Sequence, residues 1–202
     1  MQCCSDPEHA WDLYRVKSAW FPGQLRCLII GENPGDTGAT YFYDHSSGSG
    51  RDRVTVRRNL LNGLHQVRLL SAPTLGAFRA AGFLFDHAIR CHLPSAQVSK
   101  ERNRADHYDS PRAKSATHLA SLVQQAPKVW VMERIARNAV AALNCGLPED
   151  WDAAKRQAKQ ITHPPYPRQV PQEHPKFVVS RYLPHISLAE VESLCQKFRA
   201  FL

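Results

Sequence analysis

The sequence contains no apolar stretch that could cross a bilayer, because its longest apolar runs, such as Cys27–Ile30, span only a few residues. The first residues, Met1–Asp6, lack the basic start and the following apolar segment of a secretory signal peptide. Internal repeats are absent as well. These absences predict a soluble, intracellular protein of the cytoplasm without a membrane partner.

Several signatures of nucleotide and metal sites are also missing. The glycine-bounded turn that begins at Gly31 does not end in Lys-Ser or Lys-Thr, so it does not fit a phosphate-binding P-loop. The dinucleotide-binding glycine pattern is absent, and so is the pairing of His-x-Glu with Pro-Cys-x-x-Cys that zinc deaminases carry. The scattered cysteines do not resemble the disulfide framework of a small secreted protein. They are Cys3, Cys4, Cys27, Cys91, Cys145 and Cys195.

What the sequence does have is a basic balance and enough length for one domain. Its 202 residues allow a substantial buried core. The 26 Lys and Arg outnumber the 18 Asp and Glu, which gives a formal net charge of +8. An excess of positive charge favours an anionic partner, nucleic acid above all, although a merely solvated basic face has the same composition.

Short apolar runs alternate with segments of helical spacing, and this alternation predicts the fold class. The runs expected to form buried strands are Leu25–Ile30, Gly82–Ile89, Val129–Met132 and Phe177–Ser180. The expected helices are Pro7–Trp20, Val54–Leu70, Pro111–Gln125, Ile135–Leu143 and Ser187–Leu202. We expect Gly35–Arg53 to be a loop, and the proline-rich segment 147–176 to be a surface excursion. The pattern predicts an α/β fold, a three-layer α/β/α sandwich around a mostly parallel four-stranded sheet.

Ligands of such folds bind beyond the carboxyl ends of the strands, so the residues that follow the predicted strands are the first candidates for a binding site. Gly31-Glu32-Asn33-Pro34-Gly35 follows the first strand, and His185-Ile186-Ser187 follows the last. Between them, Phe83–Pro94 holds Asp86, His87 and the pair Arg90-Cys91. Pro127–Val131 provides the third strand.

In this order, these segments resemble the motifs of the uracil-DNA glycosylase superfamily, with mixed features of its thermostable and mismatch-specific members. The resemblance covers about Leu25 to Leu202 and implies a single domain that excises uracil from DNA in base excision repair. Two departures stand out. Ile186 replaces the proline of the second motif, and Gly35 replaces the bulky residue that excludes thymine in uracil-strict members. Another deaminated or alkylated base is therefore an alternative substrate, and slow or non-catalytic binding of uracil or abasic DNA is an alternative function.

The chemistry of base excision assigns a role to each motif residue. An enzyme of this kind flips the base out of the helix, and cleavage leaves a cationic sugar and an anionic base. The resemblance implies that His185 donates a hydrogen bond to the departing base and that Asn33 positions the attacking water, with Glu32 as an alternative general base. The residue that reads the base edge falls on His87 or on Asp86, depending on how the strand is counted. Gly31 belongs to the same base-binding turn.

Aromatic and basic residues near the first motif complete the predicted site. Phe42 and Tyr43 are expected to stack on the flipped base, although an aromatic cluster is as often part of a core. Contacts with DNA phosphates are expected from basic residues and one hydroxyl, with a solvated helix face as the alternative for the arginine run. These residues are Arg51, Arg53, Arg57, Arg58, Arg181 and Ser187.

We expect no cofactor or metal, and a monomeric chain. Some superfamily members hold an iron–sulfur cluster on four cysteines. Here Cys91 matches one ligand position, but Cys3 and Cys4 are adjacent, and the sequence has no cysteine between Cys91 and Cys145. The cysteine set is therefore incomplete for a cluster.

Overall fold

The structure of the chain is a computed structural model, which describes residues 18–32, 42–43, 55–89, 111–132, 136–137, 139–140, 143, 176–180 and 188–202. Within these ranges the chain forms helices and a parallel sheet, which confirms the predicted mixed α/β class. Most of the expected loop 35–53 and nearly all of the proline-rich segment lie outside the described residues. The expected helices Pro7–Trp20 and Ile135–Leu143 are described only in part.

The strands form one sheet in the order β2-β1-β3-β4, and every neighbouring pair is parallel. Their bounds are β1 Cys27–Gly31, β2 Phe83–His87, β3 Lys128–Met132 and β4 Phe177–Ser180. Every residue of β1 and β2 is buried, as expected for continuous apolar runs in a parallel sheet that is covered on both faces. The run predicted for β1 begins two residues too early and ends one residue too early, and the run predicted for β2 extends one residue too far at its start and two at its end. The run predicted for β3 begins one residue too late, whereas β4 has the predicted bounds.

The described helices follow the predicted segments, with one addition. They are α2 Thr55–Gln66, α3 Leu75–Ala80, α5 Pro111–Gln125 and α8 Leu188–Phe201. The chain leaves α2 earlier than predicted, because Arg68 adopts a left-handed backbone conformation with φ of 60°. Helix α3 was not predicted. Thr74 is the N-cap of this helix, and its side chain accepts a hydrogen bond from the backbone N–H of Ala77 at 3.2 Å. Threonine is a preferred N-cap residue, so the sequence carried this signal for a helix start.

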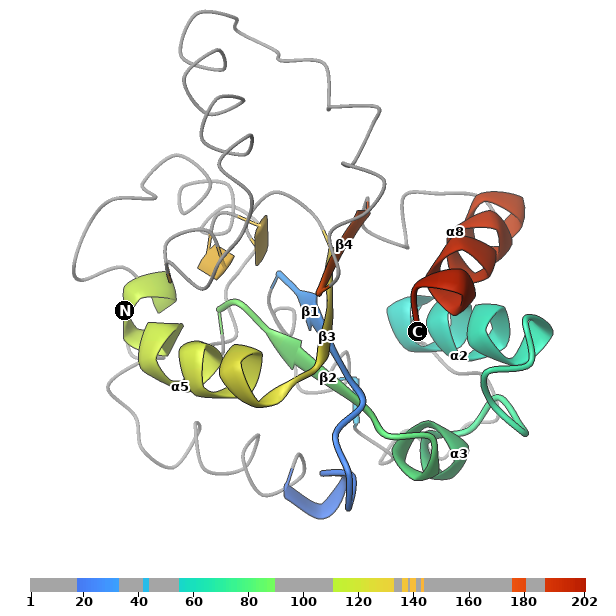
Figure 1. Cartoon of the computed structure of the whole chain (residues 1–202), viewed down its shortest axis with the longest axis horizontal. Coiled ribbons are helices and arrows are strands. Elements are labelled where there is room, and N and C mark those ends of the chain that lie inside the picture. The colour runs from blue at the N-terminus through green and yellow to red at the C-terminus, as the bar shows by residue number, and fades with distance from the viewer. Residues whose placement is uncertain are drawn as a thin grey trace, which may run out of the picture.

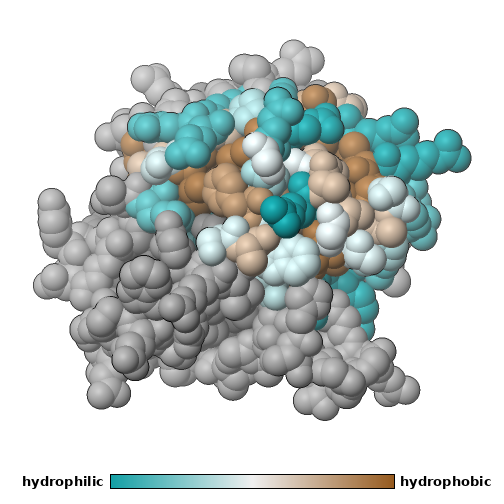
Figure 2. Space-filling model, turned by 90° about the horizontal axis from the view of Figure 1, so that it is seen from below, coloured by the Kyte–Doolittle hydropathy of each residue, from teal (hydrophilic) through white to brown (hydrophobic). Residues whose placement is uncertain are grey.

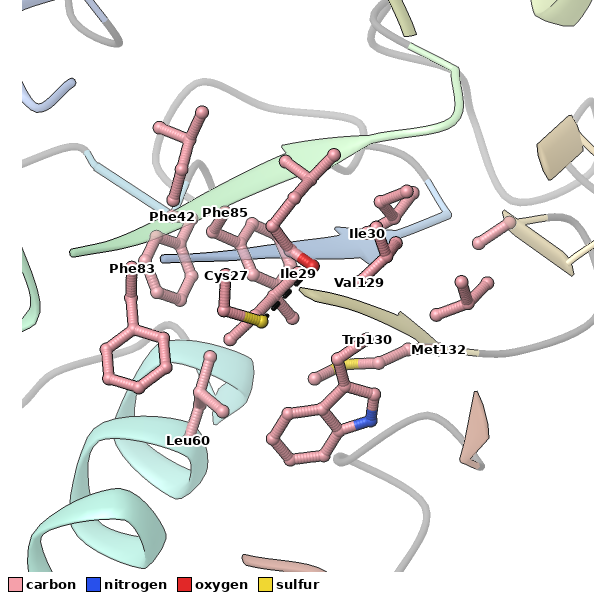
Figure 3. Close-up of a cluster of buried hydrophobic side chains, with 14 of the residues drawn as sticks. Cys27, Ile29, Ile30, Phe42, Leu60, Phe83, Phe85, Val129, Trp130 and Met132 are labelled. Carbon is pink, nitrogen blue, oxygen red and sulfur yellow. Dashed lines mark hydrogen bonds between the residues drawn. The ribbon is translucent and has the colours of Figure 1, made fainter. Parts of the chain in front are cut away.

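Helices lie on both sides of the sheet. Figure 1 shows α2 and α8 side by side on one side and α5 on the other. On the α8 side, the ring of Phe198 lies 4.5 Å from the ring of Trp130 and 6.2 Å from that of Phe83, measured between centroids. Figure 3 shows Leu60 of α2 directed toward Cys27 and Phe83 in the same layer of the core.

Helices α2 and α8 approach each other closely at Gly63. A Cβ atom at this position would lie 2.7 Å from Cγ1 of Val191 and 2.8 Å from Sγ of Cys195. Only glycine leaves room for these two side chains, so Gly63 sets the separation of the two helices. The pair of helices in turn covers the face of the sheet that carries Trp130.

Candidate active site

Described residues of two motif segments lie side by side where the chain leaves β1 and β2. In the parallel register Ile30 lies beside Asp86, and Gly31 lies beside His87. The pairing continues beyond the strands, because the backbone N–H groups of Ala88 and Ile89 donate to the carbonyl oxygens of Gly31 and Glu32, both at 2.9 Å. Backbone hydrogen bonds therefore fix Gly31 and Glu32 against the end of β2.

This end of β1 is also the point where the strand order reverses. From β1 the chain first adds β2 on one side, and later β3 on the other. In open α/β sheets the crevice at such a reversal, beyond the carboxyl ends of the strands, is the usual ligand site. Glu32 is the first residue after β1, and its side chain is buried, with 6% of the residue exposed. A buried carboxyl group at this position is a candidate for proton transfer.

Asp86 and His87 point to opposite faces of the sheet, as successive strand residues do. The carboxylate of Asp86 faces α5, where its Oδ2 atom lies 3.2 Å from Nε2 of His118. Its Oδ1 atom accepts a hydrogen bond from the backbone N–H of His87 at 2.8 Å. The two predicted base readers are therefore neighbours in the chain that face different layers of the fold.

His87 lies in the layer that contains Phe85. Its ring meets the ring of Phe85 edge-on, with centroids 5.1 Å apart. A Cβ atom at Gly31 would lie 2.8 Å from Cζ of Phe85 and 3.7 Å from Cδ2 of His87. The glycine of the first motif is thus required for the close approach of β1 to these two rings.

Phe42 and Tyr43 lie in the core, each with 1% of its surface exposed. The ring of Phe42 stacks on that of Phe85 at a centroid distance of 4.2 Å and meets Tyr43 edge-on at 4.9 Å. Tyr43 is held by hydrogen bonds to the backbone of Phe85. The sequence left open whether these rings stack on a base or belong to the core, and in the structure both side chains are packed in the core. Their stacking on a base stays a prediction that requires one of the rings to become uncovered.

Two arginines of the run, Arg57 and Arg58, lie among the described residues, and one is buried whereas the other is exposed. Arg57 is 7% exposed, and its Nη1 atom donates a hydrogen bond to the backbone carbonyl of Phe42 at 3.0 Å. Arg58, the next residue along α2, is exposed. Arg57 therefore serves the fold by tying the Phe42–Tyr43 segment to the start of α2, which the sequence had not indicated. A phosphate contact stays a prediction for Arg58, whose side chain is exposed.

Six of the predicted site residues lie outside the described residues. They are Asn33, Arg51, Arg53, Arg181, His185 and Ser187. Their roles stay predictions, and the described chain on either side gives only their neighbours in sequence. Asn33 follows Glu32 directly, and His185 falls between the end of β4 and the start of α8.

His118 is the residue that the sequence analysis missed. It lies on α5 next to buried Leu119 and one helical turn before buried Leu122. A histidine on the apolar stripe of an amphipathic helix was the available signal, because a polar ring there needs a partner beneath it. That partner, Asp86, is 32 positions away in the sequence, so only the fold reveals the pair.

A cavity of about 450 Å³ lies at the opposite end of the strands from the candidate site, near the amino-terminal ends of β1 and β2. Figure 2 views the molecule from this side, where the coloured residues are a mixture of hydrophilic and hydrophobic ones. The lining residues are Trp20, Gly23, Gln24, Arg26, Gly76, Arg79, Ala80 and Gly82. The cavity shares no residue with the predicted site, and its charged members, Arg26 and Arg79, are exposed side chains.

The described residues offer neither a membrane-spanning helix nor a cluster of metal ligands. No helix among them has the length and apolar character needed to cross a membrane. Within the same ranges, His, Cys, Asp and Glu side chains do not gather into a group of three or more that could hold a metal ion.

Comparison with known proteins identified no relative. No family model, no curated protein and no solved structure matches the chain.

Proposed function

We propose that the chain is a DNA glycosylase that excises uracil by hydrolysis of the N-glycosidic bond, in a three-layer α/β/α sandwich. The observation that carries the proposal is the position of Glu32 in the first motif. This buried carboxyl group follows β1 at the reversal of the strand order, and backbone hydrogen bonds hold its neighbour Gly31 beside the end of β2. The formal net charge of +8 supports a nucleic-acid substrate.

Each motif residue receives one role in the proposed reaction. Asn33 positions the water that attacks the sugar, and Glu32 is the alternative group for handling that water. His185 donates a hydrogen bond to the base as negative charge develops on it. Asp86 and His87 remain the two candidates for reading the base edge, now distinguished by the sheet face that each side chain occupies.

The test is single-turnover excision from an oligonucleotide with one uracil, followed by alkali to break the abasic strand. Removing one preorganised donor costs about a hundred- to a thousandfold in turnover, so we expect that loss for His185→Ala. Asn33→Ala should also be slow. Glu32→Gln keeps the shape of the side chain but cannot accept a proton, so a large loss there with a mild loss at Asn33 assigns the water to Glu32.

The matched control is Arg199→Gln, an exposed residue in the last turn of α8. It should excise uracil at the wild-type rate. If wild type retards the uracil-containing strand in a gel but leaves it intact after alkali, the chain is a binder and not a glycosylase. Normal excision by both Asn33→Ala and His185→Ala would remove the basis of the assignment.

A further inference from the structure

The pair formed by Asp86 and His118 joins strand β2 to helix α5, which carries none of the residues predicted for the site. Asp86 is the penultimate residue of β2, and its carboxylate is fixed to the backbone because Oδ1 accepts a hydrogen bond from the N–H of His87 at 2.8 Å. His118 reaches it from the middle of α5, with Nε2 at 3.2 Å from Oδ2. The strand thus holds the carboxylate, and the carboxylate holds the imidazole.

The contact with Asp86 selects one tautomer of the His118 ring if the carboxylate is ionised. An ionised carboxylate only accepts hydrogen bonds, so Nε2 of His118 then carries the proton that is shared with Asp86. In the neutral ring Nδ1 is then the basic nitrogen. A carboxylate that orients an imidazole and stabilises the imidazolium formed later is the arrangement by which hydrolytic enzymes prepare a histidine as a general base.

The exposure of the two partners argues against a purely structural pair. The side chain of Asp86 is 4% exposed, whereas that of His118 is 29% exposed. A histidine that only satisfied a buried carboxylate could be covered completely by α5 and the sheet. Here the ring extends from the buried carboxylate to the surface, close to the carboxyl-terminal end of β2, where ligands of this fold class bind.

We infer that Asp86 and His118 form a catalytic dyad in which Nδ1 of His118 accepts the proton of the attacking water. The inference rests on the proposed function and deepens it, and it leaves His87 as the candidate reader of the base edge. In the step, the oxygen of water bonds to the sugar carbon, and the C–N bond breaks with its electron pair on the base. The water proton passes to Nδ1, and the carboxylate of Asp86 stabilises the imidazolium. The dyad supplies what Asn33 lacks, because an amide can position water but cannot take its proton.

Single-turnover excision with substitutions at both partners tests the dyad. His118→Gln keeps a donor toward Asp86 but removes the basic nitrogen, and Asp86→Asn keeps the shape but reverses the preferred tautomer. General base catalysis contributes about 10²- to 10⁴-fold, so each variant should lose about that factor in rate. The double variant should be little slower than either single one, because the two residues act as a unit.

The matched control is His65→Gln. His65 is also a half-buried helical histidine, but its Nδ1 atom lies 3.1 Å from the backbone carbonyl of Leu70, within its own segment. This variant should keep the wild-type rate. All variants should bind a duplex with an uncleavable abasic-site analogue as tightly as wild type does, and circular dichroism should confirm that they are folded.

Nitrogen NMR of histidine-labelled full-length protein provides the readout that does not depend on turnover. We expect the Nε2-protonated tautomer at His118 in wild type, its loss in Asp86→Asn, and a shift of the Nδ1 resonance when the abasic-analogue duplex binds. Wild-type rates for His118→Gln would overturn the dyad while leaving the proposed function intact. If wild type excises no base, the proposed function fails, and a His118 resonance that the duplex leaves unchanged overturns the dyad as well.

Discussion

The hydroxyl group of Tyr43 bonds both polar backbone atoms of Phe85, at 2.6 Å from the nitrogen and 3.1 Å from the oxygen. Phe85 is the central residue of β2, which lies at the edge of the sheet among the described strands and pairs there with β1. Exposed strand edges present unpaired N–H and C=O groups that other chains can pair with. A single side chain thus closes part of this edge and attaches the segment that follows the first motif.

Tyr43→Phe should destabilise the fold by about 1–3 kcal/mol, because it leaves a buried N–H and a buried carbonyl of Phe85 unsatisfied while keeping the ring. The free energy of unfolding in urea measures this loss. Arg199→Gln, which changes an exposed residue, is the control and should unfold at the wild-type midpoint. An unchanged midpoint for Tyr43→Phe would mean that water or another group replaces the hydroxyl without cost.

The contact between α2 and α8 predicts opposite effects for two glycines. Gly63→Ala should destabilise the protein by about 1–3 kcal/mol, since its Cβ would lie 2.7 Å from Val191 and 2.8 Å from Cys195. Gly76→Ala is the matched control in α3, where the nearest atom to the new Cβ is Oγ1 of Thr74 at 3.9 Å. It should be neutral or stabilise by up to about 1 kcal/mol through helix propensity. Equal thermal midpoints for the two variants would contradict the close approach of the helices.

The neighbours Arg57 and Arg58 should separate stability from DNA binding. Arg57→Gln removes the bond to the carbonyl of Phe42 and should lower the free energy of unfolding by about 1–3 kcal/mol. Arg58→Gln should leave stability unchanged and weaken binding to all DNA sequences alike. If Arg58 meets a phosphate, the slope of log K against log salt should fall in magnitude by about 0.9. An unchanged slope assigns Arg58 to a solvated helix face.

The buried thiols of Cys27 and Cys195 should resist alkylation in the folded protein. Burial raises the pKa of Cys27 far above its ordinary value, and burial followed by the nearby charge of Glu192 raises the pKa of Cys195 from 9.0 to about 12. Because the thiolate is the reactive form, peptide mapping after iodoacetamide treatment should find both residues unmodified until urea unfolds the chain. Rapid labelling of either residue in the native state would contradict its burial.

The raised pKa of a buried thiol also predicts how the stability of the protein changes at alkaline pH. In the unfolded chain they ionise near 9.0, whereas in the fold Cys195 keeps its proton up to about pH 12. The folded state therefore binds more protons in this window, and the contribution of Cys195 to stability falls as the pH rises from about 9 toward 12. Cys195→Ala removes this contribution, so the stability of the variant should depend less steeply on pH in this window than that of wild type, as measured by urea unfolding.

Local sequence was enough for elements that carry a continuous or periodic apolar pattern. The run Phe177–Ser180 became β4 and the segment Pro111–Gln125 became α5, both with the bounds expected. Buried parallel strands and amphipathic helices leave such signals because the side chains that face the core are apolar, at every position of the strand or at the helical period. Where the ends depend on turns, as at Arg68 after α2 and Thr74 before α3, the apolar pattern alone gave the wrong bounds or missed the helix.

The sequence by itself determined the α/β class and the order of the motif segments, because hydrophobic period and residue type are local properties of the chain. Only the tertiary structure decided which way the side chains of the site point. It turned Asp86 toward α5 and onto His118, buried Arg57 against the carbonyl of Phe42, and placed Tyr43 on the edge of β2. These contacts join segments that are distant in sequence, and they depend on strand order and on the face that each residue occupies, which no local pattern encodes.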